Sequence, residues 1–319
     1  MVNKVIHKTG IKKGVKPKVL VVLGATASGK TALGVKLAAE LNGEIVSADS
    51  RQVYKGMDVG TGKDLAAYRL HGREIPYHLI DIADPRKSFD LAKYQKLAFA
   101  AIEKILRKGK LPIIVGGSGL YLQAIVDNYQ LGQVRPNIKK RREREGQAAA
   151  ELFAELARLK PEFARRLNNS DRHNPRRLVR YLEIIEAGGD RSLKQPSPYD
   201  FLILGLSHSD KIMRERIEYR LLERLETAGL VAEVQGLHQA GLSWERLHAF
   251  GLEYRFISEH LLGRLSYQEM VEKLTTASYR FAKRQQTWFK RWQKQGALIK
   301  WVKNETSARR AVSQWRRAV

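Results

Sequence analysis

Apolar residues gather in four short runs along the chain, and turn-forming residues bound each run. Such runs predict strands, because a strand that is buried on both faces is apolar at nearly every position. They cover residues 19–23, 44–48, 112–115 and 201–206. Apolar positions with helical spacing follow over 31–41 and 91–108. This alternation is typical of a parallel sheet covered by helices, so the expected fold class is α/β.

From about residue 129 to 199 strand-like runs vanish, charge rises and helical spacing dominates. Because strands are predicted on both sides, we expect an all-helical domain inserted into the sheet domain. The C-terminal region is predicted to be mostly helical, with a long helix over 266–293 that begins at a capping box of Ser266 and Glu269. Its predicted helical stripe is Val271, Leu274, Ala277, Phe281, Arg284 and Trp288. The expected division is a basic arm at 1–16, a core at 17–128 and 200–303, an insertion at 129–199, and a terminal helix or tail at 304–319.

A glycine-rich segment directly after the first predicted strand has the pattern of a P-loop. It consists of Gly24, Ala25, Thr26, Ala27, Ser28, Gly29, Lys30 and Thr31. In a P-loop the backbone N–H groups curl around a phosphate, the lysine adds positive charge, and the last hydroxyl binds Mg²⁺. The helix that follows directs the positive end of its dipole to the same place. The segment predicts a bound di- or triphosphate with Mg²⁺, and leaves the compound and the reaction open.

Charge and composition narrow the class of partner. The net charge is +25, with 58 Lys and Arg against 33 Asp and Glu, which favours a polyanion such as nucleic acid. A generally basic surface or an acidic membrane is the alternative. The chain has no cysteine, so disulfides and thiolate metal sites are excluded, and its eight histidines lack metal-ligand spacing. With no apolar run near ~20 residues, we expect a cytoplasmic protein with no membrane partner.

Asp49 ends the second predicted strand, at the edge where a parallel sheet binds its ligands. It is therefore expected to face the phosphates, either as a Mg²⁺ ligand or as a general base. An Asx turn or a helix cap is the structural alternative. The polar, glycine-rich residues that follow, up to Lys63, suit a loop that closes over a substrate.

Seven segments, in this order, resemble the tRNA dimethylallyltransferases, also called tRNA isopentenyltransferases. They are residues 24–31, 47–63, 78–85, 116–121, 216–220, 265–270 and 282–289. The blocks keep their order from about residue 19 to 293, and the chain is identified as a divergent member of that family. It departs from the family's pattern at Ala25, where proline is usual. It departs again at 251–255, where the glycine of a Gly-Tyr-Arg block is displaced and Glu253 adds a carboxylate.

The resemblance implies that dimethylallyl diphosphate donates its prenyl group to N6 of the adenosine 3′ of the anticodon in tRNA, and that diphosphate leaves. It implies a catalytic set of Asp49 as general base, Thr31 on Mg²⁺, and Arg220 at the leaving group. The diphosphate cradle falls on the P-loop. From the residues alone, Arg220 would be a helix-surface residue paired with Glu223 or Glu226.

Basic clusters at 135–142, 172–180 and 280–294 fit an RNA partner, and Trp288 and Trp292 in the last cluster could stack on bases. A core position is the alternative for Trp288. We assign tRNA contacts to Asp49, Ser50, Arg51, Gln52, Ser118, Lys139, Arg176, Arg177, Arg180, Arg255, Arg284 and Gln285. The expected partners are a tRNA anticodon stem-loop and dimethylallyl diphosphate, bound by a monomer. The alternatives are prenyl transfer to free adenine nucleotides, an ATP-dependent small-molecule kinase, and an inert RNA-binding protein.

Overall fold

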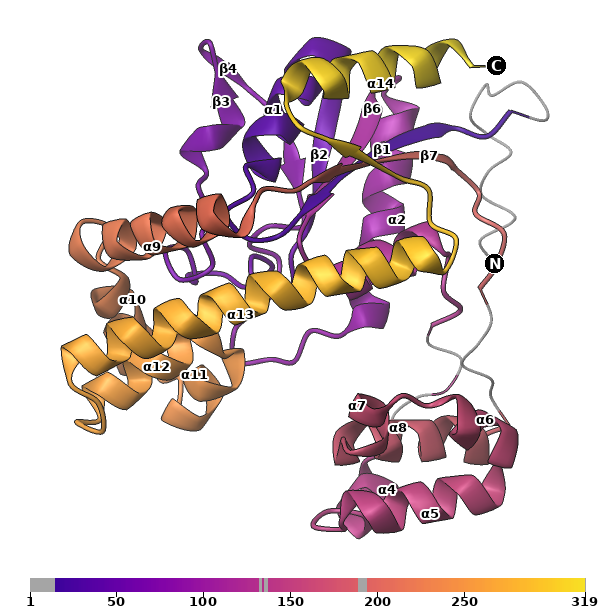
Figure 1. Cartoon of the computed structure of the whole chain (residues 1–319), viewed down its shortest axis with the longest axis vertical. Coiled ribbons are helices and arrows are strands. Elements are labelled where there is room, and N and C mark those ends of the chain that lie inside the picture. Colours follow the sequence, from indigo (N-terminus) through magenta and orange to yellow (C-terminus); the bar gives the residue numbers. More distant parts are fainter. Residues whose placement is uncertain (1–14, 132–133, 135–136, 189–193, 319) are drawn as a thin grey trace. The chain divides into compact units, whose positions relative to one another are not determined.

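The structure, a computed structural model, describes residues 15–131, 134, 137–188 and 194–318. Its centre is a parallel six-stranded sheet with the order β5-β2-β6-β1-β7-β8 (Figure 1). The strands are β1 (Lys18–Gly24), β2 (Gly43–Ala48), β5 (Tyr77–His78), β6 (Leu111–Gly116), β7 (Asp200–Leu206) and β8 (Ile299–Val302). The four predicted strands are confirmed as the four central ones, and so is the α/β class. The edge strands β5 and β8 were missed because their runs are too short to show a pattern.

Helices cover both faces of the sheet, and β1 shows why. Val19, Val21 and Leu23 point to one face, where they join the core beneath α2 (Leu91–Arg107), α3 (Gly119–Val126) and the end of α13. Leu20 and Val22 point to the other face, beneath α1 (Lys30–Leu41) and α14 (Glu305–Arg317). Between β2 and β5, a short 3-10 helix η3 (Ala66–Tyr68) leads into the ribbon of β3 (Arg69–Leu70) and β4 (Arg73–Glu74).

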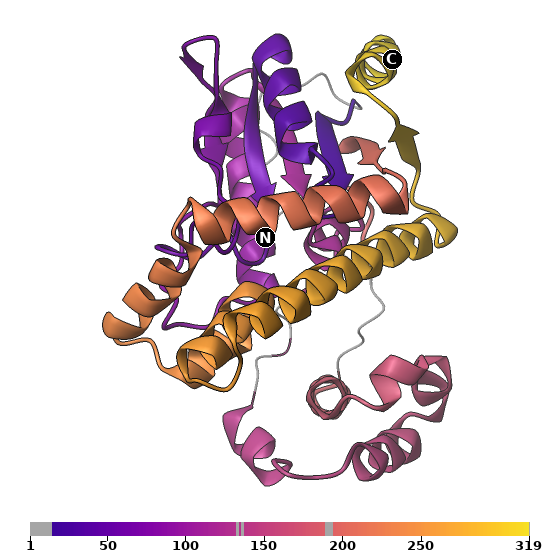
Figure 2. The ribbon, with the colours of Figure 1, turned by 60° about the vertical axis from the view of Figure 1, so that its left-hand side comes forward.

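A helical layer follows β7 and has its own apolar core. It consists of α9 (Asp210–Glu226), α10 (Leu230–Gln239), α11 (Trp244–Phe250), α12 (Leu252–Leu261) and α13 (Tyr267–Lys294). The capping box of α13 is confirmed, because the Ser266 hydroxyl accepts from the Glu269 N–H and the Glu269 carboxylate accepts from the Ser266 N–H. Figures 1 and 2 show α9 and α13 running beside each other at one end of the sheet.

The stripe predicted along α13 is wrong in register. The buried positions are Met270, Leu274, Ser278, Ala282, Gln285, Phe289 and Trp292. Only Leu274 belongs to both sets, and the buried face includes two polar side chains, Ser278 and Gln285. Trp292 is 1% exposed and cannot stack on a base, which corrects that expectation. Trp288 is half-buried, and its Nε1–H donates to Gln123 Oε1 at 3.2 Å.

The chain divides into two compact units, Met1–Val126 with Ser197–Val319, and Asp127–Pro196. The second unit contains α4 (Ile138–Glu143), α5 (Ala149–Leu159), α6 (Pro161–Arg166), α7 (Asn169–Arg172) and α8 (Pro175–Glu186). Apolar residues of α5 and α8, among them Leu152 and Leu182, build its core. The expected insertion was 129–199. Residues 1–14 of the predicted basic arm, and Arg135 and Pro136, lie outside the described residues.

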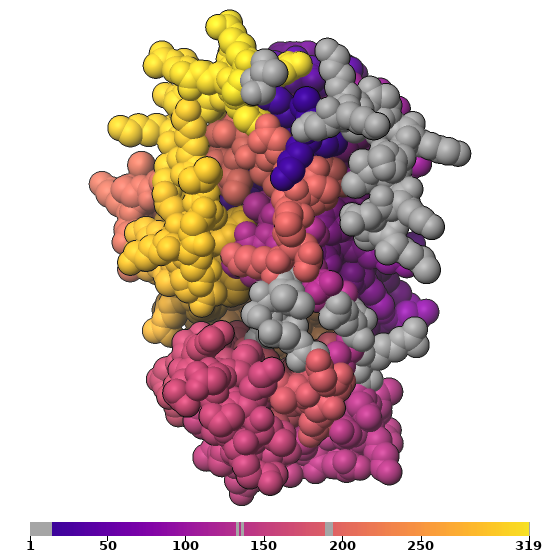
Figure 3. All heavy atoms as spheres, turned by 90° about the vertical axis from the view of Figure 1, so that its right-hand side faces the viewer, coloured from indigo at the N-terminus to yellow at the C-terminus, as the bar shows by residue number. Residues whose placement is uncertain are grey.

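A helix or a tail was expected at the C-terminal residues. They form the helix α14, which packs Ala308, Ala311 and Val312 against the sheet. Figure 3 shows the face on which the yellow side chains of this part stand out from the surface. Over residues 300–317 the exposed cations are Lys300, Lys303, Arg309, Arg310, Arg316 and Arg317. Of the helices that the structure describes, none is both long and apolar enough to cross a bilayer.

Candidate active site

The P-loop forms the turn from β1 into α1. Gly29 has a φ of 83°, a left-handed conformation that glycine adopts without strain, directly before the helix begins. Gly24 has no room for a side chain, because a Cβ there would lie 2.4 Å from Ser28 Oγ and 3.1 Å from Leu206 O. In α1, all of whose residues are described, the first turn holds no acidic side chain. The helix N-terminus is thus open to an anion.

Lys30 is the charged group of this loop. Its Nζ lies 3.3 Å from the carbonyl oxygen of Ala25. Burial lowers the pKa of Lys30 to about 8; Asp49 opposes this shift, whereas Arg220 and Arg224 add to it. Burial is thus the main reason that the ammonium group loses its proton more easily, and among its charged neighbours Asp49 acts more strongly than either arginine. A bound anion would favour the charged form.

Asp49 follows β2 directly and shows both features that the sequence suggested. Its Oδ1 accepts from the N–H of Arg51 at 2.8 Å and more weakly from the N–H of Gln52 at 3.4 Å, so the Asx turn is real. The residue also lines the cavity over the P-loop. Within the described part of the chain nothing donates to Oδ2. One oxygen fixes the carboxylate, and the other is available to a substrate.

A cavity of about 470 Å³ lies over the P-loop and joins most of the predicted site residues. Those that line it are Thr26, Ala27, Lys30, Thr31, Asp49, Ser50, Arg51, Gln52, Ser118, Arg220, Arg255, Arg284 and Gln285. Gly24, Ala25, Ser28 and Gly29 shape the loop without lining the cavity. Apolar side chains of the helical layer complete the wall, namely Ile217, Leu221, Phe250, Leu252, Phe256 and Phe281. Charged and apolar surfaces thus face one space, as a ligand with a phosphate end and a hydrocarbon end requires.

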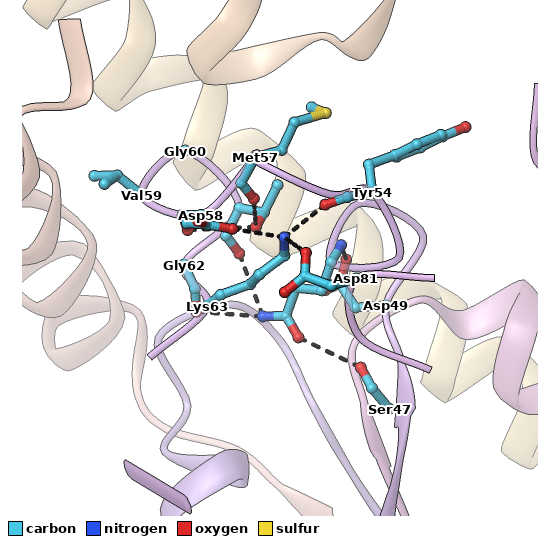
Figure 4. Close-up of polar contacts among 12 residues, drawn as sticks. Ser47, Asp49, Tyr54, Met57, Asp58, Val59, Gly60, Gly62, Lys63 and Asp81 are labelled. Atoms are coloured by element: carbon cyan, nitrogen blue, oxygen red, sulfur yellow. Dashed lines mark hydrogen bonds and ion pairs between the residues drawn. The ribbon is translucent and has the colours of Figure 1, made fainter. Parts of the chain in front are cut away.

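The residues after Asp49 form a fixed wall of this cavity. The side chain of Lys63 is fully buried, and its Nζ contacts Asp58 Oδ1 at 2.7 Å, Tyr54 O at 2.5 Å and the carboxylate of Asp81 (Figure 4). Gln52 Nε2 donates to the carbonyl oxygens of Thr61 and Gly62, at 3.3 and 3.2 Å. The sequence predicted a loop here but missed these contacts, because the partners are up to 18 residues apart.

Glu233 of α10 also holds this loop. Its carboxylate accepts from three consecutive N–H groups, those of Asp58 at 2.7 Å, Val59 at 2.6 Å and Gly60 at 3.0 Å. It also accepts from the hydroxyl of Tyr254 at 2.8 Å. The loop expected to close over a substrate is therefore already in place beside the cavity.

Arg220 of α9 faces the cavity. Within the described residues it forms no ion pair with Glu223 or Glu226, so the helix-surface alternative is not realised. Burial lowers the pKa of Arg220, and Arg224 one helical turn later lowers it further. Sequence reasoning missed Arg224, which also lines the cavity. The only available signal was its spacing of four residues from Arg220.

Two other predicted contacts hold the protein itself together. Gln285 is 8% exposed, and its side-chain amide accepts from the Thr26 N–H and donates to Gly117 O, both at 2.8 Å. The hydroxyl of Ser118 accepts from the Ser50 N–H at 3.0 Å. Both side chains line the cavity, so they shape it while their polar groups are used internally.

The predicted RNA-binding cations of the second unit differ in whether a carboxylate of the protein pairs with them. Lys139 and Arg176 are exposed, and no carboxylate among the described residues pairs with them. Arg177 binds Asp171 at 2.7 Å, and Arg180 binds Glu183 at 2.9 Å. Two of the four cations are thus partly neutralised by their neighbours.

The oxygen donors present fit Mg²⁺, although no group of three or more histidine and acidic side chains among the described residues could enclose a metal. Thr31 and Asp49 both line the cavity beside the P-loop. Mg²⁺ is usually held by one or two protein oxygens together with phosphate oxygens and water, and the hydroxyl of Thr31 could provide one of these protein oxygens. The buried Ser28 Oγ also has no hydrogen-bond partner among the described residues.

The chain matches the IPP transferase family over residues 52–292. It is 47% identical to the tRNA dimethylallyltransferase 1 of Syntrophus aciditrophicus, a match that covers 90% of this chain and 93% of that protein. The tRNA dimethylallyltransferase of Treponema pallidum (strain Nichols) is 43% identical, with coverage of 89% and 90%.

Solved structures show the same likeness. The full-length tRNA isopentenylpyrophosphate transferase of Bacillus halodurans superposes with a TM-score of 0.65 at 34% identity and covers 90% of both chains. A eukaryotic dimethylallyltransferase acting on tRNA, with a TM-score of 0.74 and 24% identity over 95% of this chain and 78% of that one, shares the fold. The family match, the common fold and the sequence identity to relatives, which extends over nine-tenths of the chain, all agree. The chain belongs to the IPP transferase family, that of the tRNA dimethylallyltransferases.

Proposed function

We propose that the protein transfers the dimethylallyl group of dimethylallyl diphosphate to N6 of the adenosine 3′ of the anticodon in tRNA, releasing diphosphate. The observation that carries this proposal is that one cavity presents the parts the reaction needs. Lys30, Thr31 and Arg220 line it together with the carboxylate of Asp49 and an apolar wall. The relatives that the chain resembles are named tRNA dimethylallyltransferases, which supports the transfer of a dimethylallyl group to tRNA.

The P-loop side of the cavity would hold the diphosphate. As the bond between the allylic carbon and the bridging oxygen breaks, negative charge develops on that oxygen. Lys30, Arg220 and the N–H groups at the start of α1 would stabilise this charge. Mg²⁺, held by Thr31 with Asp49 nearby, would add positive charge on the diphosphate oxygens when bound. The apolar residues of α9, α12 and α13 would surround the five-carbon group and keep water away from it.

Asp49 would act on the amine. N6 of adenosine is a poor nucleophile, because its lone pair is delocalised into the ring. As the new bond to the allylic carbon forms, N6 loses a proton, and Asp49 Oδ2 would accept it. The Arg51 N–H on Oδ1 orients the carboxylate for this role. The proton balance is complete, since the amine gives up one proton and diphosphate leaves with the electrons of the broken bond.

The RNA has to bring its base into the cavity. A loop base can leave its stack at a cost of roughly a few kcal/mol, less than a paired one. Arg255 and Arg284 are exposed and line the cavity, so they are placed to bind phosphates beside the extruded nucleotide. Lys139 and Arg176 of the second unit are proposed as further phosphate contacts.

The test is to supply donors and acceptors separately. The protein is incubated with Mg²⁺ and either dimethylallyl diphosphate or labelled ATP, and the acceptor is an anticodon stem-loop or free AMP. We expect nucleoside mass spectrometry to detect prenylated adenosine only where the stem-loop is combined with dimethylallyl diphosphate. Prenylated AMP with an unmodified stem-loop would favour the free-nucleotide enzyme, and phosphate transfer from ATP would favour a kinase.

A further inference from the structure

Two arginines of α9 lie side by side against the same glycine. A Cβ built on Gly62 would lie 2.2 Å from Nη2 of Arg224 and 3.5 Å from Nη2 of Arg220. Both arginines line the cavity over the P-loop. Gly62 has a φ of 65° and leaves space that any side chain would fill. The fixed loop over residues 57–63 thus makes room for two guanidinium groups.

Glu253 approaches Arg224 from α12. Glu253 Oε1 lies 3.5 Å from Arg224 Nη1, and each side chain is 17% exposed. Burial raises the pKa of Glu253, although Arg224 opposes that shift. A buried carboxylate of this kind is costly unless a cation is held against it. Glu253 is also the carboxylate by which this chain departs from the family's Gly-Tyr-Arg block, and the contact with Arg224 gives it a physical role.

The charges around the cavity do not balance. The cations that line it are Lys30, Arg51, Arg220, Arg224, Arg255 and Arg284, and the carboxylates are Asp49 and Glu253. Arginines one turn apart on a helix repel each other. The carboxylates of Asp64, Glu223 and Glu253 offset burial and this repulsion only in part for Arg220, whose pKa remains lowered. The field of Arg224 reaches the P-loop, since it acts on Lys30 in the same direction as that of Arg220.

We propose that Arg224 is a third cationic ligand of the diphosphate, alongside Lys30 and Arg220, and that Glu253 is the residue that positions it. This rests on the proposed function and adds to its diphosphate site. Glu253 of α12 holds the guanidinium at Nη1, whereas Nη2 lies against Gly62, which also lines the cavity. A residue that only balanced charge would weaken anion binding, whereas a positioning residue strengthens it. The two roles of Glu253 therefore predict opposite signs.

The first measurement is calorimetric binding of inorganic diphosphate with Mg²⁺ to the full chain. Arg224→Met should weaken binding by about 10- to 50-fold, the range of one charged hydrogen-bonding partner, and Arg224→Lys should fall between it and the wild type. Lys211→Met is the matched control, because it removes an exposed cation from the first turn of α9. It should stay within about twofold of the wild type, as expected of an isolated surface charge. Unchanged binding by Arg224→Met would overturn the proposal.

Glu253→Gln tests the positioning role, because it keeps the shape of the side chain and removes its charge. We expect about threefold weaker diphosphate binding, and no further effect in the Arg224→Met background, since coupled residues are not additive. Tighter binding by Glu253→Gln would show a mere counter-charge and overturn the positioning role. Thermal unfolding of each variant identifies any loss of the fold, and Arg224→Lys keeps the test valid if Arg224→Met is unstable.

Two further readouts separate this proposal from the function on which it rests. In one outcome the wild type binds diphosphate, Lys30→Ala abolishes that binding, and Arg224→Met binds as tightly as the wild type. The proposal for Arg224 then fails, whereas the proposed function stands. If the wild type does not bind diphosphate at all, the proposed function itself fails. If Arg224→Met weakens anticodon stem-loop binding and leaves diphosphate binding unchanged, Arg224 contacts RNA phosphate and the proposal is overturned.

Discussion

The cavity over the P-loop and the inserted helical unit are both rich in arginine and lysine, but they use these residues in opposite ways. In the cavity six cations face two carboxylates, and burial lowers the pKa of Lys30 to about 8. In the helical unit the buried carboxylate of Glu183 accepts from both Arg141 and Arg180. Arg144 likewise contacts Glu155 and Glu186.

The number of basic residues in a sequence therefore does not measure the positive charge that is available to a ligand. The pKa of Glu183 is lowered although its burial acts in the other direction, because Arg141, Arg180 and the Asn137 N–H all bind it. Those cations stabilise the fold of their own unit. In the cavity the excess charge remains for an anion, so the same residue type serves binding there.

The largest effect is expected at Asp49, the acid that faces the cluster of cations. Asp49→Asn keeps the size of the side chain and an oxygen for the Arg51 N–H. It should lower turnover by roughly 10²–10⁴-fold, as for a lost general base, while diphosphate still binds. Single-turnover prenyl transfer and diphosphate calorimetry on the same preparation check both parts. Turnover near that of the wild type would remove Asp49 from the role of base.

The second-largest effect is expected on the stability of the helical unit, when the carboxylate that its arginines share is removed. Glu183→Leu leaves three donors without their shared acceptor and should destabilise the unit by about 1–3 kcal/mol. Hydrogen exchange of residues 137–188 in the full chain measures the change. Glu162→Gln is the matched control, since its ion pair with Arg165 is exposed, and it should change local stability by less than about 1 kcal/mol. Equal exchange in the two variants would contradict the comparison.

The third effect is a pH dependence of diphosphate affinity, which arises from Lys30 in the cavity and has no counterpart in the helical unit. Below pH 7 Lys30 is already charged, so its titration should not change the diphosphate affinity in that range. Above about pH 8 free Lys30 loses its proton, and binding has to restore it. Affinity should then fall by up to about tenfold per pH unit beyond the loss from diphosphate's own ionisation. Lys30→Arg, which stays charged, should not show this additional fall. If the diphosphate affinities of the wild type and Lys30→Arg changed with pH in parallel, Lys30 would be charged over the whole pH range.

The smallest effect separates free from paired cations within the helical unit. Replacing Lys139 and Arg176 by alanine should flatten the log–log salt dependence of stem-loop binding by roughly 0.7–0.9 for each RNA phosphate that is no longer bound. Replacing Arg177 and Arg180 should flatten it less, because Asp171 and Glu183 already neutralise them in part. Equal slopes for both double variants would mean that pairing does not decide which cations reach RNA.

The sequence predicts what depends on neighbouring residues. The central strands are continuous apolar runs, the start of α13 is a capping box, and the P-loop is a contiguous motif, so each was found. The structure gathers thirteen of the predicted residues around one cavity. It does not gather Lys139, Arg176, Arg177 or Arg180 there, since these belong to the helical unit.

What depends on distant partners was not predictable. Arg224 meets Glu253 29 positions away, and Lys63 finds Asp58 and Asp81 only after the loop has folded. Along α13 one buried position that was missed is Gln285, whose side chain accepts from the Thr26 N–H of the P-loop. An apolar pattern carries no information about a polar side chain that is buried to satisfy a backbone N–H.

In the proposed function, one cavity brings an allylic diphosphate to an RNA adenosine. The most direct measurement is a single turnover with dimethylallyl diphosphate labelled in its prenyl group and an anticodon stem-loop, followed by nucleoside mass spectrometry. We predict one labelled prenyl group on N6 of the adenosine 3′ of the anticodon with the wild type, and almost none with Asp49→Asn, although both proteins bind diphosphate. Label on another nucleotide, on free adenine nucleotides or on no acceptor would contradict the account.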